Sequence, residues 1–213
     1  MPNAIRLLIA DDHAIMREGL KQLFALSSDL QVIAEADSGP MVLKRLQQGD
    51  IDLLLLDMNM PGLHGEDLIL HIRNLYPAQK ILVLSMHNEP QFAQRALRAG
   101  ATGYLCKECD PETLFYAIRR VAAGNRYIDP QIAEGIAFEA SGLRPQCHHD
   151  KLTSREFQVL RLLASGNSVT AIAEKLTISS KTVSTHKARL MDKMGLPNNA
   201  AIVRYAVSQS LIE

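Results

Sequence analysis

The sequence predicts a doubly wound parallel α/β sheet of five βα units, followed by a smaller all-α domain. Three observations support this fold class. Five short apolar runs alternate with segments of helical periodicity over residues 1–124. Most of these runs lack polar alternation, which is typical of strands that helices cover on both faces. Beyond residue 150 the periodicity is helical.

The predicted strands and helices follow one another in strict alternation. The strands are Ile5–Ala10, Val32–Ala36, Leu53–Leu56, Ile81–Leu84 and Gly103–Leu105. The helices are Ala14–Leu26, Pro40–Gln48, Gly65–Leu75, Pro90–Ala99 and Pro111–Ala123. The first helix carries one apolar stripe that includes Ile15, Leu20, Leu23 and Phe24. The last has Asp110 as its N-cap and proline at its first helical position, both typical of a helix start.

Charge divides the chain into three parts. The 23 basic and 23 acidic residues cancel overall, but the net charge is −3 over residues 1–124, −2 over 125–150 and +5 over 151–213. We predict domains over the first and last of these ranges and a linker between them, with Gly and Pro in Ser141–Pro145. Asp129 and Pro130 can start a short linker helix whose Ile132, Ala133 and Ile136 share a face. That face either packs against the first domain or forms a dimer contact.

The composition excludes several classes of protein. No apolar run approaches the roughly 18–20 residues of a membrane helix, and the N-terminus lacks the features of a secretory signal. Three cysteines do not suggest a disulfide framework, so we expect a cytoplasmic protein with no membrane partner. Cys106 and Cys109, with Cys147–His149, could form a zinc or redox site. Chance placement is the favoured interpretation.

Polar residues follow the predicted strands at their carboxyl ends, where such sheets bind ligands. Asp11 and Asp12 follow the first strand, Asp57 the third, Ser85 the fourth and Lys107 the fifth. Three neighbouring carboxylates repel one another unless a cation is present, and an all-oxygen set suits Mg²⁺. A carboxylate beside Mg²⁺ can attack a phosphoryl group, whose charge the ammonium, the hydroxyl and the metal would stabilise.

A helix-turn-helix is predicted in residues 151–213. Thr153 and Glu156 form a capping box before an apolar run, and a second helix follows over Val169–Leu176. A short turn leads to a third helix that begins at Ser180. This third helix has a buried stripe of Val183, Leu190 and Met194. Its opposite face carries small and hydroxylated residues flanked by basic ones, which suits the major groove and phosphates of DNA: Lys181, Ser184, Thr185, Ala188, Lys187 and Arg189.

Residues 4–124 resemble bacterial response-regulator receiver domains. The resemblance rests on Asp11-Asp12, the run Asp57–Gly62 (DMNMPG), Ser85, and Tyr104 three residues before Lys107. It implies that Asp57 is the phosphoacceptor and that Mg²⁺ is held directly by Asp12 and Asp57, through water by Asp11, and by the backbone carbonyl of Asn59. It also implies that Ser85 and Tyr104 form a switch pair.

Residues 151–213 resemble the LuxR-type helix-turn-helix of NarL/FixJ-class regulators. The matching segments include Leu152–Glu156, Ile172–Ser179, Thr182–His186 and Lys193–Gly195. The resemblance implies that residues 181–189 read DNA, with Thr182 and the basic residues on phosphates. It also implies that the helix over Asn199–Gln209 mediates dimerisation through Val203, Ala206 and Val207. For His186 a structural hydrogen bond is at least as plausible as a base contact.

Together these observations predict a two-component response regulator, which is not an enzyme beyond its own phosphorylation and slow dephosphorylation. A sensor histidine kinase, Mg²⁺, double-stranded DNA and a second copy of the chain are its expected partners. One alternative is a DNA-binding regulator that does not depend on phosphorylation. A more distant one is a haloacid-dehalogenase-like phosphatase, which would need a second Asp where this chain has Asn59.

Overall fold

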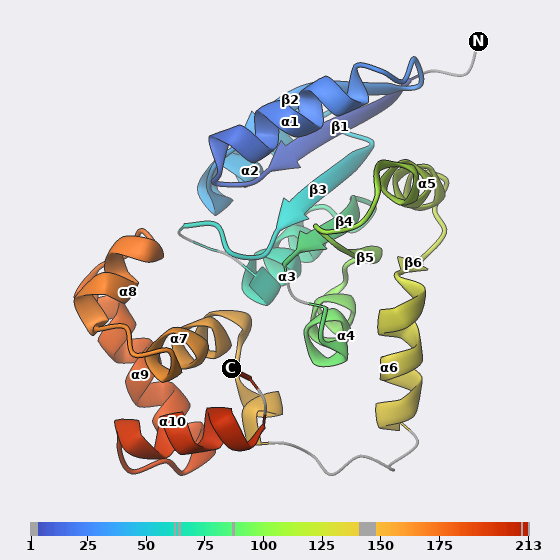
Figure 1. The fold of residues 1–213 in the computed structure, drawn as a ribbon. Helices are drawn as coiled ribbons and strands as arrows, with labels where there is room; N and C mark the ends of the chain where they lie inside the picture. The colour runs from blue at the N-terminus through green and yellow to red at the C-terminus, as the bar shows by residue number, and fades with distance from the viewer. Residues whose placement is uncertain are drawn as a thin grey trace. The chain divides into compact units, whose positions relative to one another are not determined.

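A computed structural model describes residues 4–61, 63, 65–86, 88–140, 148–209 and 211–212. The chain divides into two compact units, Met1–Arg144 and Pro145–Glu213, whose elements are labelled in Figure 1. Gly62, the predicted linker residues Ser141–Pro145 and Cys147 lie outside the described residues. None of the helices in the described ranges combines the length and hydropathy that a bilayer span requires.

The first unit is a parallel sheet with strand order β2-β1-β3-β4-β5-β6. Its strands are β1 (Ile5–Ala10), β2 (Leu30–Ala36), β3 (Leu53–Asp57), β4 (Lys80–Ser85), β5 (Gly103–Cys106) and β6 (Tyr127–Ile128). Its helices are α1 (Ala14–Phe24), α2 (Gly39–Gln47), α3 (Gly65–Leu75), α4 (Pro90–Ala99), α5 (Pro111–Ala122) and α6 (Pro130–Ala140). The predicted doubly wound fold is therefore confirmed.

Burial on both faces explains the apolar strands. Leu7 of β1 and Leu55 of β3 pack with Phe24 of α1 and Ile118 of α5 in one core. Leu54, whose side chain points to the opposite face, is also fully buried. Strand β3 is consequently buried along its whole length, and its one polar residue, Asp57, lies at its carboxyl end.

Strand β6 and helix α6 extend the first unit beyond the five predicted βα units. Strand β6 pairs in parallel with β5 and places Ile128 opposite Tyr104, and the Asp129 N–H donates to the Tyr104 carbonyl over 3.3 Å. Helix α6 follows and packs against α4. A Cβ at Gly135 would lie 2.4 Å from Pro90 Cγ, so this approach requires glycine. The predicted linker helix is present and packs within the first unit.

The second unit is helical throughout its described part. It contains a 3₁₀ turn, η1 (His148–Lys151), and the helices α7 (Ser154–Ala164), α8 (Val169–Lys175), α9 (Ser180–Met194) and α10 (Asn199–Ser208). The predicted capping box of Thr153 and Glu156 is present, and Ser179 caps α9 by accepting from the Thr182 N–H. The short turn between α8 and α9 holds Thr177 at φ 52°, a left-handed conformation. The predicted helix-turn-helix is thus confirmed.

Candidate functional site

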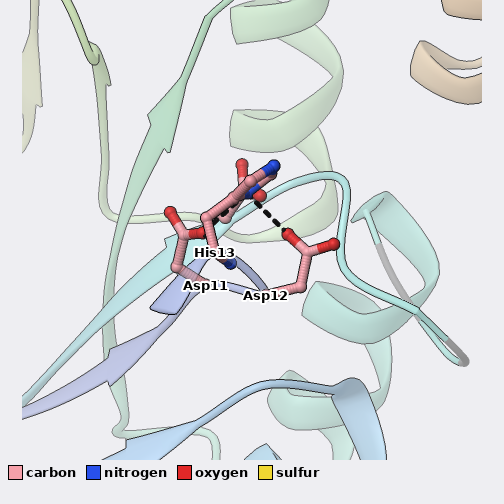
Figure 2. A group of neighbouring side chains, drawn as sticks. Asp11, Asp12 and His13 are labelled. Carbon is pink, nitrogen blue, oxygen red and sulfur yellow. Dashed lines mark hydrogen bonds and ion pairs between the residues drawn. The ribbon is translucent and has the colours of Figure 1, made fainter. Parts of the chain in front are cut away.

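An acidic cluster lies at the carboxyl end of the sheet. Asp57 is the last residue of β3, and Asp11 follows the adjacent strand β1. Ligand-type atoms of Asp11, Asp12, His13 and Asp57 all lie within 4.8 Å of one another. Asp11 and Asp57 are buried, Asp12 is half-buried and His13 is exposed. Figure 2 shows the side chains of Asp11, Asp12 and His13 beside one another.

The chain between β1 and α1 is held by hydrogen bonds to Asp11. Asp11 Oδ1 accepts the backbone N–H of His13 over 2.8 Å, and His13 is the N-cap of α1. Arg17, one turn into α1, donates from Nη1 to the Asp11 carbonyl over 2.7 Å. These contacts fix Asp11 at the edge of the sheet and place His13 beside it.

Lys107 lies between two of the carboxylates. Its Nζ is 2.6 Å from Asp11 Oδ2 and 3.1 Å from Asp57 Oδ1, and all three side chains are buried. Burial raises the pKa of Asp57; Lys107 opposes this rise, and the charges of Asp11 and Asp12 add to it. Burial disfavours the ammonium, but Asp57 and Asp11 outweigh it and raise the pKa of Lys107. One buried cation therefore faces more than one carboxylate.

Ser85 and Tyr104 are joined on the neighbouring strands β4 and β5. Both are buried, Tyr104 completely, and a hydrogen bond links their side chains. Burial raises the pKa of Tyr104 above its usual value. Because the ring is completely buried and its hydroxyl contacts Ser85, the side chain is turned inward.

The cluster has the donor chemistry of a divalent cation site. Its ligand-type atoms are mainly carboxylate oxygens, and Asp12 Oδ1 is a buried atom that accepts no hydrogen bond, although His13 Nδ1 is 2.9 Å away. An oxygen in this state is well suited to a metal. Asn59 follows Asp57 by two residues, and the role of its backbone carbonyl stays a prediction.

The two described cysteines flank Lys107 and are free thiols. Burial raises the pKa of Cys109 to about 11, which disfavours a reactive thiolate. His149, which the sequence offered as a further ligand of a zinc site, lies in the second unit and contacts the Tyr205 hydroxyl through Nδ1 over 2.6 Å. Within the described ranges, the acidic cluster is the one group of potential metal ligands, and it includes neither the cysteines nor His149.

Helix α9 presents the predicted DNA-facing residues on its surface. Val183, Leu190 and Met194 are buried against the other helices, as expected. The residues exposed on the helix are Lys181, Thr182, Ser184, Thr185, Ala188 and Arg189, with Lys187 half-buried. His186 is half-buried beside the apolar stripe.

Hydroxyl groups on this face bond back to the helix. Ser184 donates to the Ser180 carbonyl over 2.9 Å, and Thr185 donates to the Lys181 carbonyl over 3.0 Å. Their oxygens keep lone pairs that can accept hydrogen bonds from a ligand. The face therefore combines small polar groups with cations.

The three residues predicted to mediate dimerisation do not share one surface. Val203 and Val207 are exposed on α10, whereas Ala206 is completely buried in the core of its own unit. Ala206 lies one turn after the buried Ile202, on the inward stripe of α10. An exposed seam on α10 would therefore consist of the two valines without Ala206.

Two family models match the chain. Residues 7–119 match the response regulator receiver domain, and residues 150–206 match the LuxR family of bacterial regulatory proteins. The chain is a two-component response regulator of the NarL/FixJ class. It combines a receiver domain with a LuxR-type DNA-binding domain, the combination that characterises transcription factors rather than enzymes.

Relatives of this response regulator match along nearly its whole length. It is 34% identical to response regulator GacA of Pseudomonas aeruginosa over 98% of each chain. It is 39% identical to transcriptional regulatory protein UhpA of Escherichia coli, over 94% of this chain and 96% of UhpA. Among solved structures, Salmonella typhimurium RcsB matches with a TM-score of 0.62 at 30% identity, covering 99% of this chain and 100% of that one. A structure of RcsB dimers bound to DNA matches with a TM-score of 0.60 at 29% identity, covering 97% and 99%.

His13 was not predicted as a member of the acidic cluster of Asp11, Asp12 and Asp57, beside which it lies. The residue directly follows Asp11 and Asp12 at the end of β1, a position from which its side chain could have been expected near the cluster. A single histidine does not by itself indicate a metal or catalytic site. Only its position directly after Asp11 and Asp12 pointed to the acidic cluster.

Proposed function

We propose that phosphorylation of Asp57 by a sensor histidine kinase, dependent on Mg²⁺, controls dimerisation and sequence-specific DNA binding by this response regulator. The observation that carries this proposal is the buried Asp57 carboxylate, 3.1 Å from the Lys107 ammonium and next to Asp11 and Asp12. An anionic nucleophile beside a buried cation, with an adjacent set of metal ligands, suits phosphoryl transfer.

The residues have distinct roles in the proposed transfer. An Asp57 carboxylate oxygen bonds to phosphorus while the bond from phosphorus to the donor imidazole nitrogen breaks, and that electron pair leaves with the imidazole. Lys107 balances negative charge on the phosphoryl oxygens. When bound, Mg²⁺ supplies further positive charge, and Asp12, Asp57, the Asn59 carbonyl and, through water, Asp11 would hold it.

Ser85 and Tyr104 form the proposed switch. The Ser85 hydroxyl is buried at the end of β4 and can turn from Tyr104 toward a phosphoryl group on Asp57. This turn changes the hydrogen bond on which the inward position of Tyr104 depends. The conformational equilibrium of the receiver surface then shifts with phosphorylation.

Helix α9 is the proposed DNA reader, with Lys181, Thr182, Lys187 and Arg189 on phosphates and the small residues Ser184, Thr185 and Ala188 near base edges. The exposure of this face supports the assignment.

Dimers bound to DNA, as in the RcsB structure, are the proposed active form, with Val203 and Val207 at the α10 seam. Chromosomal DNA as ligand implies a cytoplasmic location. We retain the limits 1–124, 125–150 and 151–213 as functional regions, with β6 and α6 of the middle region docked on the receiver fold.

Labelling with radioactive acetyl phosphate tests the phosphoacceptor. Asp57→Asn should abolish labelling, and Asp67→Asn, an exposed carboxylate on α3, should leave it intact. Chelation of divalent cations should also abolish it. Label retained by Asp57→Asn contradicts the assignment.

Promoter binding tests the output. Affinity should fall steeply with salt, because phosphate contacts release counterions, and Lys181→Ala should flatten this dependence. If Asp57→Asn leaves DNA binding and dimerisation unchanged under phosphorylating conditions, the proposed switch is wrong and only the DNA-binding assignment stands.

A further inference from the structure

His13 lies against two carboxylates of the acidic cluster. Its Nδ1 is 3.0 Å from Asp11 Oδ1 and 2.9 Å from Asp12 Oδ1, and Figure 2 shows the imidazole beside both. The side chain is 70% exposed, so core packing does not force it into this position.

The distance between His13 Nδ1 and Asp12 Oδ1 matches neighbouring corners of a metal coordination shell. In an octahedral site with ligands at about 2.0–2.1 Å from the ion, adjacent ligand atoms are about 3 Å apart. The 3.0 Å contact of the same nitrogen with Asp11 Oδ1 is a hydrogen bond that holds the imidazole beside Asp12. Asp57 offers a further oxygen within the 4.8 Å span of the whole cluster.

Lys107 contacts two of the three aspartates in the cluster, Asp11 and Asp57. It binds Asp11 Oδ2 and Asp57 Oδ1, whereas the nitrogen of His13 is next to Asp11 Oδ1 and Asp12 Oδ1. Of these atoms, Asp12 Oδ1 is buried without accepting a hydrogen bond. Lys107 thus pairs with the carboxylates of Asp11 and Asp57, and the Asp12 carboxylate is left to face His13.

We propose that His13 is a third direct side-chain ligand of the cation site, beside Asp12 and Asp57, and that its nitrogen makes the site prefer divalent transition ions such as Mn²⁺ to Mg²⁺. The proposal rests on the metal site of the proposed function and adds a ligand to it. Imidazole suits transition ions, whereas Mg²⁺ favours oxygen ligands and gives up its waters reluctantly. The same carboxylates therefore bind either ion, and His13 sets the preference.

Mn²⁺ is the probe for the test, used with the full chain, free of chelator and without a polyhistidine tag. Electron spin-echo envelope modulation detects nitrogen bound to Mn²⁺. We expect nitrogen modulation in the unaltered protein and in His71→Ala, which removes an exposed histidine on α3. His13→Ala should lose it, with circular dichroism verifying its fold and His13→Gln as a second variant.

Competition titration measures the preference itself. His13→Ala should weaken Mn²⁺ binding about tenfold or more relative to Mg²⁺ binding, because changes to the groups around a metal lower its affinity by about that factor. His71→Ala should not change the ratio of the two affinities. Mn²⁺ that binds in an Asp12-dependent manner without nitrogen modulation overturns the role of His13 and leaves the carboxylate site intact. Absence of any binding that Asp12→Asn removes overturns both the metal site and this inference.

Discussion

Replacing the phosphoacceptor with its neutral isostere should make the receiver unit more stable when no divalent cation is present. In Asp57→Asn the side chain keeps its size, but one of three clustered carboxylates loses its charge. Lys107 keeps its contact with Asp11 at 2.6 Å. The variant therefore removes a charge that burial disfavours, and burial is the largest cause of the raised pKa of Asp57.

The distances give the magnitude. At an effective dielectric constant of about 20, the attraction between Asp57 Oδ1 and Lys107 Nζ at 3.1 Å is roughly 5 kcal/mol. Repulsion of Asp57 by Asp11 and by Asp12, within 4.8 Å, is at least about 3.5 kcal/mol for each pair. With the Lys107 hydrogen bond included, attraction and repulsion roughly offset each other, and the cost of burying the charge, on the order of a few kcal/mol, leaves a gain of roughly 2 kcal/mol in the variant. For a unit of this size, this gain raises the melting temperature by roughly 4–8 °C.

Scanning calorimetry of the full chain in chelator provides the assay. The transition of the receiver unit should rise in Asp57→Asn while that of the helical unit stays in place. Asp67→Asn, an exposed change on α3, should give no such gain. Added Mg²⁺ should reduce the difference, because a bound cation offsets the repulsion in the unaltered protein.

The pH dependence has a definite sign. Because burial raises the pKa of Asp57, the folded state holds this proton more tightly than the unfolded state does. The destabilisation by Asp57 is therefore fully present above its folded pKa and disappears as the pH falls below the unfolded value of about 3.9. The gain in Asp57→Asn should shrink on acidification. An unchanged melting temperature at neutral pH, or a gain that grows in acid, contradicts this account.

Two further changes have defined outcomes. Gly135→Ala should destabilise the first unit, although alanine normally stabilises a helix by about 1 kcal/mol relative to glycine, because the new Cβ would lie 2.4 Å from Pro90 Cγ. Calorimetry gives the sign, and faster hydrogen exchange in α6 should accompany it. Thr153→Ala should cost the second unit about 1 kcal/mol by removing the capping box with Glu156, and an unchanged transition of that unit would show that the cap contributes nothing.

The apolar pattern was sufficient to predict the five βα units and the helical domain. Strand β3 is a run of leucines that ends in Asp57, and a buried parallel strand explains such a run directly. Strand β6 could not be predicted in this way, because Tyr127 and Ile128 are too short a run to show periodicity. Its position depends on pairing with β5, which is a tertiary contact.

The same distinction applies to the sites. The order of the strands brings Asp11, Asp57 and Lys107 together, so parallel topology alone was enough to place them at one edge. His13 and Ala206 depend instead on local side-chain direction. Ala206 is buried, whereas Val203 and Val207 on the same helix are exposed. Helical spacing alone did not distinguish the buried residue from the two exposed ones.

The docking of β6 and α6 has a practical consequence for preparing the receiver as an isolated fragment. A fragment that stopped at residue 124 would leave β5 as a bare sheet edge and uncover Pro90, against which Gly135 packs. Unpaired edge strands invite association between chains, so such a fragment should self-associate more readily than one extended through Ala140. Oligomers seen with the shorter fragment would then reflect the cut rather than phosphorylation.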